Sequence, residues 1–531
     1  MTSTQTLTGS SIIAGETVAG DAGTLRAIDP ATGETLEPAY SLLAPAEVER
    51  ATRAAAEAAP AYAALSPARR AAFLRTVADR VEALGETLVA RAVAESGLPV
   101  GRLTGELGRT TGQLRLMATV VEQGDHLQAR IDPALPDRTP LPRPDLRQVH
   151  VPLGPVAVFG ASNFPLAFST AGGDTAAALA AGCPVVVKAH NAHPGAAELV
   201  GRAVTEAVAE HGLPAGVFSL LYGGGNEIGQ ALVSDPRITA VGFTGSRGGG
   251  LALVAAAAAR PVPIPVYAEM SSINPVLVMP GGLSDPAALA AGYVGSLTLG
   301  AGQFCTNPGL LLLPTGPDGD AFLAAAGELV GAATGQTMLT PGIAEAYRTG
   351  AQALAAAGAE PVAEGTPGSG PHAPAPAVYA TTTADLAARP ELQAEVFGAL
   401  GLVVRYSSTD ELLTAVGDLE GQLTATVHAG AGDTEALAPV LPLLATKVGR
   451  VLFGGWPTGV EVSHAMVHGG PFPATSDGRS TSVGTLAVHR FQRPVCFQDA
   501  PDEVLPPSLQ RANPWGLSRR VDGVVRRPEE Q

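Results

Sequence analysis

The 531-residue sequence is poor in cysteine, in aromatic residues and in charge. Three cysteines, an odd number in a long chain, do not make a disulfide framework, and they favour a reducing compartment. The net charge of −16 argues against nucleic acid or an acidic membrane surface as the main partner. No uncharged apolar run reaches the roughly 18 residues of a membrane span, and residues 1–10 lack the pattern of a secretion signal. We therefore expect a soluble cytoplasmic protein that binds neither nucleic acid nor membrane.

Short apolar segments alternate with alanine-rich stretches along most of the chain. This alternation is typical of βαβ units, in which helices cover a buried parallel sheet, so we predict an α/β fold class. Five predicted strands lie in residues 155–269, as PVAVFG, CPVVVK, GVFSLL, TAVGFTG and IPVYAE. Five more lie in residues 275–455, as PVLVM, GLLLLP, LGLVVRY, TATVHAG and GRVLFGG.

The flanking segments differ from this pattern. Residues 41–123 are expected to be helical, and Ser66-Pro67 predicts a helix start because a capping hydroxyl precedes a first-turn proline. The proline-rich residues 131–153 cannot form a long helix and are predicted to be an extended arm. The tail, residues 499–531, is rich in proline and arginine and is expected to lie on the surface.

Two residues in loops are candidates for chemistry. Cys305 lies in the glycine-rich loop GAGQFCTNPG, where small neighbours leave a thiol open to substrate. Cys183 and Cys496 lie in apolar segments, the usual setting of a packed free thiol. Asn163 follows PVAVF at the carboxyl edge of the predicted sheet, where ligands of open α/β sheets bind, although a turn-forming asparagine is the alternative.

Charged strand ends and glycine-containing turns are further candidates for a binding site. Lys188, Glu269 and Glu395 each lie at or near the end of an apolar segment, although a strand end that reaches water explains any one of them as well. The turns at residues 223–225 and 243–246 can present backbone N–H groups to a phosphate. Four histidines show no metal-ligand spacing, so we expect no metal; they are His428, His464, His468 and His489.

Six segments resemble the aldehyde dehydrogenase superfamily in their order and spacing. They are GASNFP, VVVKAHNAHP, GFTGS, AEMSS, GQFCT and EVFG. The segments GWPTGVEVSHAMVHGGPFPAT and RFQRPVCFQ further resemble the branch that acts on α-ketoglutarate semialdehyde (2,5-dioxopentanoate) and forms 2-oxoglutarate. The resemblance implies NAD(P)-dependent oxidation of an aldehyde to a carboxylic acid through a cysteine thiohemiacetal and a thioester.

The resemblance also implies roles for individual residues. Cys305 would attack the aldehyde carbon, Asn163 would stabilise the oxyanion, and Glu269 would take the proton of the hydrolytic water. We expect burial to raise the pKa of Glu269, which suits a base that works near neutral pH. The implied cofactor-binding residues are Lys188, His190, Asn191, Gly225, Gly245, Ser246, Glu395 and Phe397.

Cofactor preference and substrate binding call for finer expectations. Members that prefer NAD often carry a glutamate three positions after the lysine, whereas this chain has Asn191, so we expect NADP to be favoured with NAD still usable. Arg109 and Gln113 lie one helical turn apart and are proposed to bind the distal carboxylate of the substrate. A salt bridge between Arg109 and Glu106, or an exposed arginine, is an equally good interpretation.

The resemblance implies an aldehyde dehydrogenase fold with three parts. A Rossmann-like dinucleotide domain would comprise residues 1–130 and 150–269, and an α/β catalytic domain residues 270–480. A small β oligomerisation arm would comprise residues 131–149 and 481–498, and pairing of its edges across subunits would give a homodimer or homotetramer.

Three alternatives remain beside this interpretation. The chain can be a fatty or general aldehyde dehydrogenase, or a catalytically silent relative with a binding or structural role. A cysteine hydrolase without a cofactor is a third, but it leaves the five strand-end turns that suit a dinucleotide without a purpose.

Overall fold

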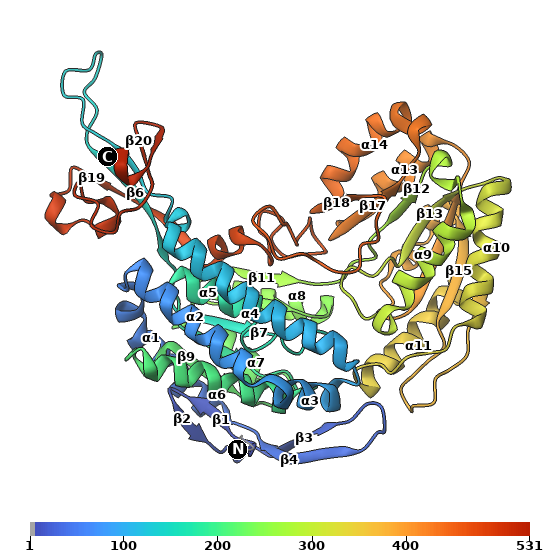
Figure 1. The fold of residues 1–531 in the computed structure, drawn as a ribbon, viewed down its shortest axis with the longest axis horizontal. Coiled ribbons are helices and arrows are strands. Elements are labelled where there is room, and N and C mark those ends of the chain that lie inside the picture. The colour runs from blue at the N-terminus through green and yellow to red at the C-terminus, as the bar shows by residue number, and fades with distance from the viewer. Residues whose placement is uncertain (1–5, 531) are drawn as a thin grey trace.

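The computed structural model describes residues 6–530 and contains three main sheets with helices packed around them (Figure 1). The first sheet has the order β11-β10-β7-β8-β9-β1-β2. Its five parallel strands are the five predicted from residues 155–269: β7 (Val156–Phe159), β8 (Val185–Lys188), β9 (Phe218–Leu221), β10 (Ala240–Thr244) and β11 (Val266–Glu269). These predictions are confirmed because buried parallel strands are apolar on both faces and therefore read as continuous runs.

Helices cover this sheet, and several of them come from the predicted helical region (Figure 1). The helix predicted at Ser66-Pro67 is confirmed: α2 begins at Pro67, and the Ser66 hydroxyl accepts a hydrogen bond from the Arg69 backbone N–H. The helices of this part are α1 (Pro45–Ala63), α2 (Pro67–Ala83), α3 (Gly85–Ser96), α4 (Val100–Gln123), α5 (Gly173–Ala181), α6 (Pro194–Glu210), α7 (Glu227–Ser234) and α8 (Arg247–Ala258).

The second sheet follows in the chain and has the order β14-β15-β16-β13-β12-β17-β18. All five strands predicted between residues 275 and 455 are present, and β14 and β15 join them at one edge. The strands are β12 (Val276–Val278), β13 (Leu310–Pro314), β14 (Glu360–Glu364), β15 (Ala377–Thr382), β16 (Leu400–Tyr406), β17 (Thr424–His428) and β18 (Arg450–Phe453). The helices are α9 (Pro286–Thr298), α10 (Pro317–Ala332), α11 (Pro341–Ala356), α12 (Thr383–Ala388), α13 (Thr409–Asp418) and α14 (Thr434–Lys447).

A third, smaller sheet lies to one side of the first, in the order β19-β6-β5-β20-β21 (Figure 1). Its first three strands come from the predicted arm and its surroundings: β5 (Arg130–Asp132), β6 (Leu146–Pro152) and β19 (Gln492–Gln498). The tail adds β20 (Arg519–Val521) and β21 (Val524–Arg526), and its Leu505, Leu509 and Leu517 are buried. Most of the tail is exposed or half-exposed, as expected, and these leucines give it an apolar side that packs inward.

The N-terminal strands were not predicted. β1 (Ser11–Ile13) and β2 (Glu16–Val18) extend the first sheet, and β3 (Thr24–Ile28) pairs with β4 (Thr35–Ser41) as a separate ribbon. Residues 1–5 and 531, which belong to the predicted dinucleotide domain and tail, lie outside the described residues. No helix among residues 6–530 combines the length and the apolar composition that crossing a bilayer demands.

Candidate active site

The site forms where parallel strands of the first sheet end. β11 ends at Glu269, which lies in register with Thr244 of β10, and the Gly245 N–H donates to the Glu269 carbonyl at 3.1 Å. β7 ends at Phe159, in register with Lys188, and the turn that carries Asn163 follows directly. Because parallel strands end at one edge, residues from four separate segments meet there, as open α/β sheets require for a ligand site.

The loop that carries Cys305 has an unusual backbone. Gly300, Ala301 and Gly302 all have positive φ, at 57°, 59° and 69°, and only glycine adopts this conformation without strain. A Cβ added at Gly302 would lie 2.2 Å from the carbonyl carbon of Gly398. The glycine is therefore needed twice, for its φ and for the close approach of the two loops.

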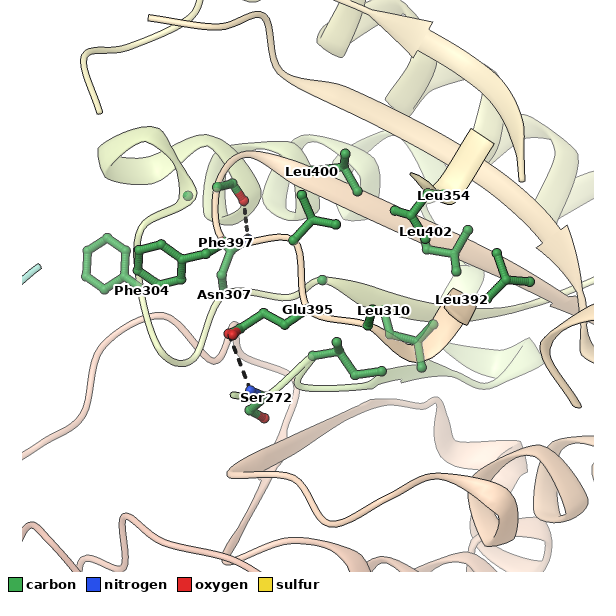
Figure 2. A pocket seen from close by; sticks show the side chains of 16 residues that line it. Ser272, Phe304, Asn307, Leu310, Leu354, Leu392, Glu395, Phe397, Leu400 and Leu402 are labelled. Carbon is green, nitrogen blue, oxygen red and sulfur yellow. Dashed lines mark hydrogen bonds between the residues drawn. The ribbon is translucent and has the colours of Figure 1, made fainter. Parts of the chain in front are cut away.

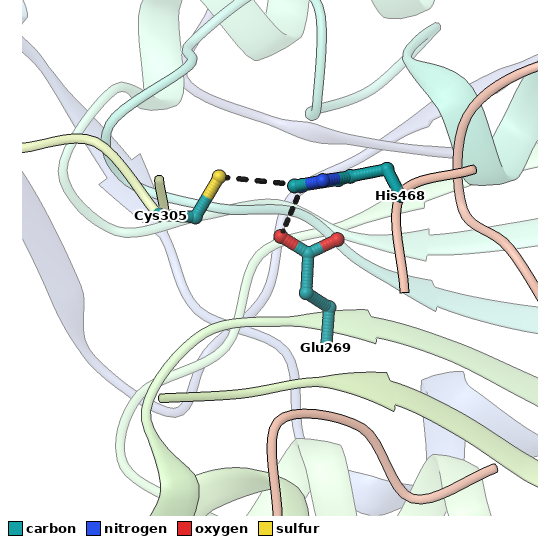
Figure 3. Close-up of side chains that lie close together, drawn as sticks. All are labelled: Glu269, Cys305 and His468. Carbon is teal, nitrogen blue, oxygen red and sulfur yellow. Dashed lines mark hydrogen bonds and ion pairs between the residues drawn. The ribbon is translucent and has the colours of Figure 1, made fainter. Parts of the chain in front are cut away.

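Cys305, His468 and Glu269 meet in one cluster (Figure 3). The Cys305 Sγ lies 3.3 Å from His468 Nε2, which in turn lies 2.9 Å from Glu269 Oε1. The second carboxylate oxygen, Oε2, accepts a hydrogen bond from the Ser482 hydroxyl at 2.8 Å. His468 and Ser482 are fixed to each other, because the Ser482 N–H donates to the His468 carbonyl at 2.8 Å. One long loop therefore supplies two partners to the end of β11.

Burial and charge shift the pKa values of this cluster in opposite directions. Burial of the Cys305 thiol, with the charge of Glu269 beside it, raises the pKa of Cys305 well above its ordinary value. Burial also raises the pKa of Glu269, but the charge of His468 and hydrogen bonds from His468 and Ser482 lower it more, and the pKa lies below its ordinary value. The expectation of a raised pKa for Glu269 is wrong, because the surroundings of this carboxylate are polar rather than apolar.

Asn163 is held beside the loop that carries Cys305. Its side chain is buried, and its Nδ2 donates to the Gln303 carbonyl, two residues before Cys305, at 3.0 Å. Arg102 donates to the Asn163 carbonyl at 2.7 Å, and the Glu106 carboxylate accepts from the N–H groups of Leu166 and Ala167 at 2.8 and 3.0 Å. Helix α4 therefore holds both ends of the turn that presents the Asn163 amide.

The same helix carries cations toward the site. The Arg109 guanidinium lies over the rings of Phe164 and Phe168, at 5.6 and 4.9 Å from their centroids. Its Nε and one Nη are buried without a hydrogen-bond partner, and Arg109 forms no ion pair with any residue in 6–530. The alternative of a salt bridge with Glu106 is therefore wrong. Gln113 is buried too, but its amide faces Gly173 of α5 and forms no hydrogen bond with Arg109 or with any other residue in 6–530.

A cavity of about 490 Å³ lies beside the ends of β7, β8 and β10. Five of the residues predicted to bind cofactor line it: Lys188, His190, Gly225, Gly245 and Ser246. The cavity reaches the N-terminus of α8, where the Ser246 hydroxyl accepts from the Gly249 N–H at 3.2 Å. Among the lining residues, all of which lie in 6–530, none carries a carboxylate. Backbone donors at a helix start and a nearby cation suit a pyrophosphate or phosphate.

The pKa values of Lys188 and His190 are both lowered in this cavity. Burial lowers the pKa of Lys188 to about 8 and lowers that of His190 well below its ordinary value. Lys188 Nζ donates to the Asn191 side-chain oxygen at 2.7 Å, so Asn191 acts through the lysine and is not itself a lining residue. The Ala192 N–H donates to His190 Nδ1 at 3.1 Å, which leaves the proton of the neutral ring on Nε2.

Glu395 and Phe397 lie on a neighbouring segment (Figure 2). The Ser272 N–H donates to Glu395 Oε1 at 3.3 Å, and burial raises the pKa of Glu395 to about 7. Glu395 also lines a cavity of about 300 Å³ that shares Ser246 with the larger cavity. Asn307 of the loop that carries Cys305 donates to the Gly398 carbonyl at 3.1 Å. The predicted cofactor residues thus follow one path from α8 to the Cys305 loop.

Sequence reasoning missed His468, Ser482 and Arg102. His468 was set aside because no motif spacing joins it to another ligand, yet it lies in a group with Glu269 and Cys305 whose ligand atoms are all within 4.8 Å of one another. No local signal identifies such a group, since its members come from three distant segments. Arg102 was open to prediction, because it lies seven residues before Arg109 and so on the same face of a helix.

The arrangement supplies the parts of a covalent reaction at a carbonyl. It has a thiol nucleophile, an ionised carboxylate, an imidazole between them and an amide donor. A cavity suited to a dinucleotide lies at the strand edge, and the guanidinium of Arg109, with free donors, lies against aromatic rings.

Known proteins resemble this chain over nearly its whole length. The sequence pattern of the aldehyde dehydrogenase family matches residues 17–470. The chain is 56% identical over 520 residues to alpha-ketoglutaric semialdehyde dehydrogenase 2 of Azospirillum brasilense, with 97% of this chain and 99% of that protein covered. It is 47% identical over 520 residues to alpha-ketoglutaric semialdehyde dehydrogenase of Acinetobacter baylyi, with 97% and 98% covered. The crystal structure of the aldehyde dehydrogenase KauB from Pseudomonas aeruginosa has the same fold, with a TM-score of 0.80 at 21% identity over 93% of this chain and 97% of that one.

Proposed function

The chain belongs to the aldehyde dehydrogenase family, and we propose that it oxidises 2,5-dioxopentanoate to 2-oxoglutarate with NADP or NAD as hydride acceptor. Enzymes of this family act on aldehydes and use NAD(P). The observation that carries the reaction is the contact of Cys305 with His468 and Glu269 beside the Asn163 amide. The names of two relatives with full-length matches support the substrate.

In the proposed reaction, the Cys305 thiol loses its proton to Glu269 and the sulfur attacks the aldehyde carbon. The carbonyl oxygen takes the electron pair of the double bond, and the Asn163 amide and the Cys305 N–H donate to this oxyanion. One such donor typically stabilises the transition state by about 3–4 kcal/mol. When bound, the nicotinamide ring supplies hydride acceptance. Loss of hydride from the carbon leaves a thioester on Cys305.

Glu269 then acts on water. After its first proton has passed to solvent, the ionised Glu269 takes a proton from a water molecule while the water oxygen attacks the thioester carbon. The carbon–sulfur bond then breaks, which releases the free acid and the Cys305 thiolate. His468 Nε2 lies between the two groups, 2.9 Å from the carboxylate and 3.3 Å from the sulfur. Its N–H can donate to the Glu269 carboxylate first and to the Cys305 thiolate once the carboxylate holds the proton. His468 is therefore proposed to position both groups.

Arg109 is proposed to bind the distal carboxylate of the substrate. Its guanidinium is buried against aromatic rings and has free donors, and a carboxylate is the group that such a planar fork binds best. Arg102 lies over the rings of Phe164 and Phe304 on the same helix face and also has a free buried Nη. Gln113 stays a weaker proposal, because its amide faces α5.

NADP is proposed to be favoured over NAD. Asn191 and the absence of a carboxylate among the cavity residues in 6–530 remove the repulsion that a 2′-phosphate would meet, and Lys188 and His190 Nε2 offer donors. The residues therefore fit a phosphorylated dinucleotide, with Gly225, Gly245 and Ser246 beside its phosphates and Glu395 and Phe397 toward the nicotinamide ribose.

A substrate screen tests the proposed function. We expect kcat/KM for 2,5-dioxopentanoate to exceed that for hexanal by at least a hundredfold, and kcat/KM with NADP to exceed that with NAD. A preference for hexanal would establish the alternative of a fatty or general aldehyde dehydrogenase. No turnover of any aldehyde, together with a Cys305 thiol whose alkylation is unaffected by substrate, would establish a silent relative.

Arg109→Ala gives a sharper prediction. Loss of the guanidinium is expected to raise KM for 2,5-dioxopentanoate at least tenfold while leaving KM for hexanal within twofold, because hexanal has no charge to bind. Arg115→Ala is the matched control, since Arg115 lies on the same helix but pairs with Asp79 and Glu82 at the surface. Equal effects of Arg109→Ala on both aldehydes would refute the role.

The third sheet has two open edges, β19 on one side and β21 on the other. We propose that these edges pair across subunits in a homodimer or homotetramer. Three unpaired cysteines agree with a cytoplasmic enzyme.

A further inference from the structure

We propose that Cys305, His468 and Glu269 form a site for one zinc ion, which blocks the enzyme reversibly. The three side chains offer a thiolate, an imidazole nitrogen and a carboxylate oxygen, the usual ligands of zinc in proteins. Three protein ligands leave the fourth tetrahedral position to water. The ion would hold the nucleophile, so it would inhibit the reaction and take no part in it.

The distances between the ligand atoms lie near those of a tetrahedral zinc site, and all three atoms are within 4.8 Å of one another. Bonds of about 2.3 Å to sulfur and about 2.0–2.1 Å to nitrogen and oxygen place neighbouring ligands roughly 3.3–3.6 Å apart. The sulfur and Nε2 are 3.3 Å apart, and Nε2 and Glu269 Oε1 are 2.9 Å apart. Side-chain movements of at most about an ångström would bring all three pairs to these separations. The ion would replace the protons in the hydrogen bonds that link His468 to Cys305 and to Glu269.

The surroundings hold the ligands in place. The Ser482 hydroxyl donates to Glu269 Oε2 at 2.8 Å, and this kind of contact fixes the direction of a metal-binding carboxylate. The His468 ring packs against Phe168, with centroids 6.3 Å apart, and its backbone N–H donates to Thr481 at 2.8 Å. The ligands carry two negative charges when Cys305 is a thiolate, which a divalent cation neutralises.

The chain contains a control for adventitious thiol binding. Cys496 is exposed on β19 and Cys183 is buried, and neither belongs to a group of three metal-ligating side chains within residues 6–530. Zinc bound at Cys496 would be insensitive to changes at His468. Zinc at the proposed site, in contrast, requires Cys305 and His468 together.

Cobalt(II) is the probe for this site, because a thiolate bound to it gives a charge-transfer band in the near ultraviolet and a tetrahedral site gives strong visible bands. The full-length enzyme, free of nucleotide and aldehyde, is titrated with Co²⁺, and Zn²⁺ is then added. We expect both bands to saturate at one metal per chain and to disappear as Zn²⁺ displaces the cobalt. Cys305→Ser should abolish the charge-transfer band, His468→Asn should weaken binding at least tenfold, and Cys496→Ser should change neither.

Absence of the band in the wild-type enzyme, its persistence in Cys305→Ser or its loss in Cys496→Ser would overturn the proposal. Retained NADP binding and an unchanged unfolding temperature would show that each variant is folded, so that a lost band reports a lost ligand. Inhibition of turnover by Zn²⁺ and its reversal by EDTA complete the test. This inhibition rests on the proposed function, whereas metal binding does not. Active metal-free enzyme without the cobalt bands would refute only the site, and cobalt bands on an enzyme that turns over no aldehyde would refute only the function.

Discussion

At the scale of the residue, Glu269 shows how a buried carboxylate stays ionised. Burial alone would raise its pKa, but His468 and Ser482 each bind one of its oxygens, and the pKa falls below its ordinary value. A general base must accept a proton and release it again. Hydrogen bonds that can break when the carboxylate is protonated allow this. In the proposed reaction, the contacts of Glu269 would therefore set the pH range of turnover.

Ser482→Ala is expected to shift that range. The Ser482 hydroxyl stabilises the ionised form of Glu269, and a hydrogen bond to a charged group is worth about 1.5–3 kcal/mol, or roughly 1–2 pKa units. Loss of the bond raises the pKa, so the acid limb of the kcat profile should move to higher pH. Ser482→Thr keeps a hydroxyl and should leave the limb in place. An unmoved limb in Ser482→Ala would show that this contact does not tune Glu269.

Sequence reasoning at this scale found residues with local signals and missed those without. Cys305 was found because its loop is rich in glycine, and Glu269 because it ends an apolar strand. His468 lies in a long irregular segment, where no periodicity predicts which side chain turns toward the strand edge. Its proposed role follows only from the folded arrangement. The fold brings His468 to Cys305, from which it is separated by 163 positions in the sequence, and to Glu269, from which it is separated by 199.

At the scale of the element, helix α4 supports the site along one face. Arg102, Glu106, Arg109 and Gln113 follow at intervals of four, three and four residues and so share that face. Arg102 and Glu106 hold the turn of Asn163, while Arg109 lies over the neighbouring aromatic rings. The periodicity could have predicted this grouping from the sequence. The sequence could not predict that the Glu106 carboxylate accepts from backbone N–H groups instead of pairing with Arg109. That contact depends on where the turn of residues 163–168 packs.

Glu106→Ala is expected to damage both stability and catalysis. It leaves the buried N–H groups of Leu166 and Ala167 without an acceptor, and each orphaned group costs about 1–3 kcal/mol. Denaturant unfolding should show a loss of about 2–6 kcal/mol for the two groups together, and kcat should fall because the Asn163 amide is no longer fixed. Thr104→Ala, on the exposed side of α4, is the control and should change neither. Wild-type stability in Glu106→Ala would contradict the role given to this carboxylate.

The strands show which elements a sequence predicts. Ten parallel strands were predicted, since burial on both faces makes a strand continuously apolar; nine are largely buried, and β18, at a sheet edge, is half-exposed. The strands β1 to β4 were missed because they are short or half-exposed, and the buried leucines of the tail were missed among its prolines and arginines. Their places depend on the sheets they join rather than on their own composition.

At the scale of the whole molecule, three histidines lie where the third sheet meets the helices of the first. His126 follows α4, His150 lies in β6, and His489 precedes β19; the rings of the last two are 5.5 Å apart. Burial lowers the pKa of all three, and that of His126 falls to about 3. The fold therefore keeps these rings neutral where its parts join.

Acid is expected to weaken the fold through these residues. The unfolded chain binds a proton at His126 below about pH 6.5, whereas the folded chain does not until about pH 3, so stability is complete above pH 6.5 and falls as the pH decreases. At pH 5 the loss from His126 is about 2 kcal/mol. The unfolding temperature of His126→Asn should decline less between pH 7 and pH 5 than that of the wild type. His464→Asn, at an exposed histidine, should follow the wild type, and parallel curves for all three proteins would contradict the account.

The central claim is that the sulfur of Cys305 becomes acylated as hydride leaves for the dinucleotide. A single-turnover reaction of the NADP-bound enzyme with 2,5-dioxopentanoate, followed by nicotinamide absorbance and by mass spectrometry of the Cys305 peptide, tests it most directly. We predict a burst of NADPH equal to the enzyme concentration and an acyl adduct on that peptide, a slower burst in Glu269→Gln because the thiol has lost its base, and neither signal in Cys305→Ala. NADPH formation by Cys305→Ala at the wild-type rate would contradict the account.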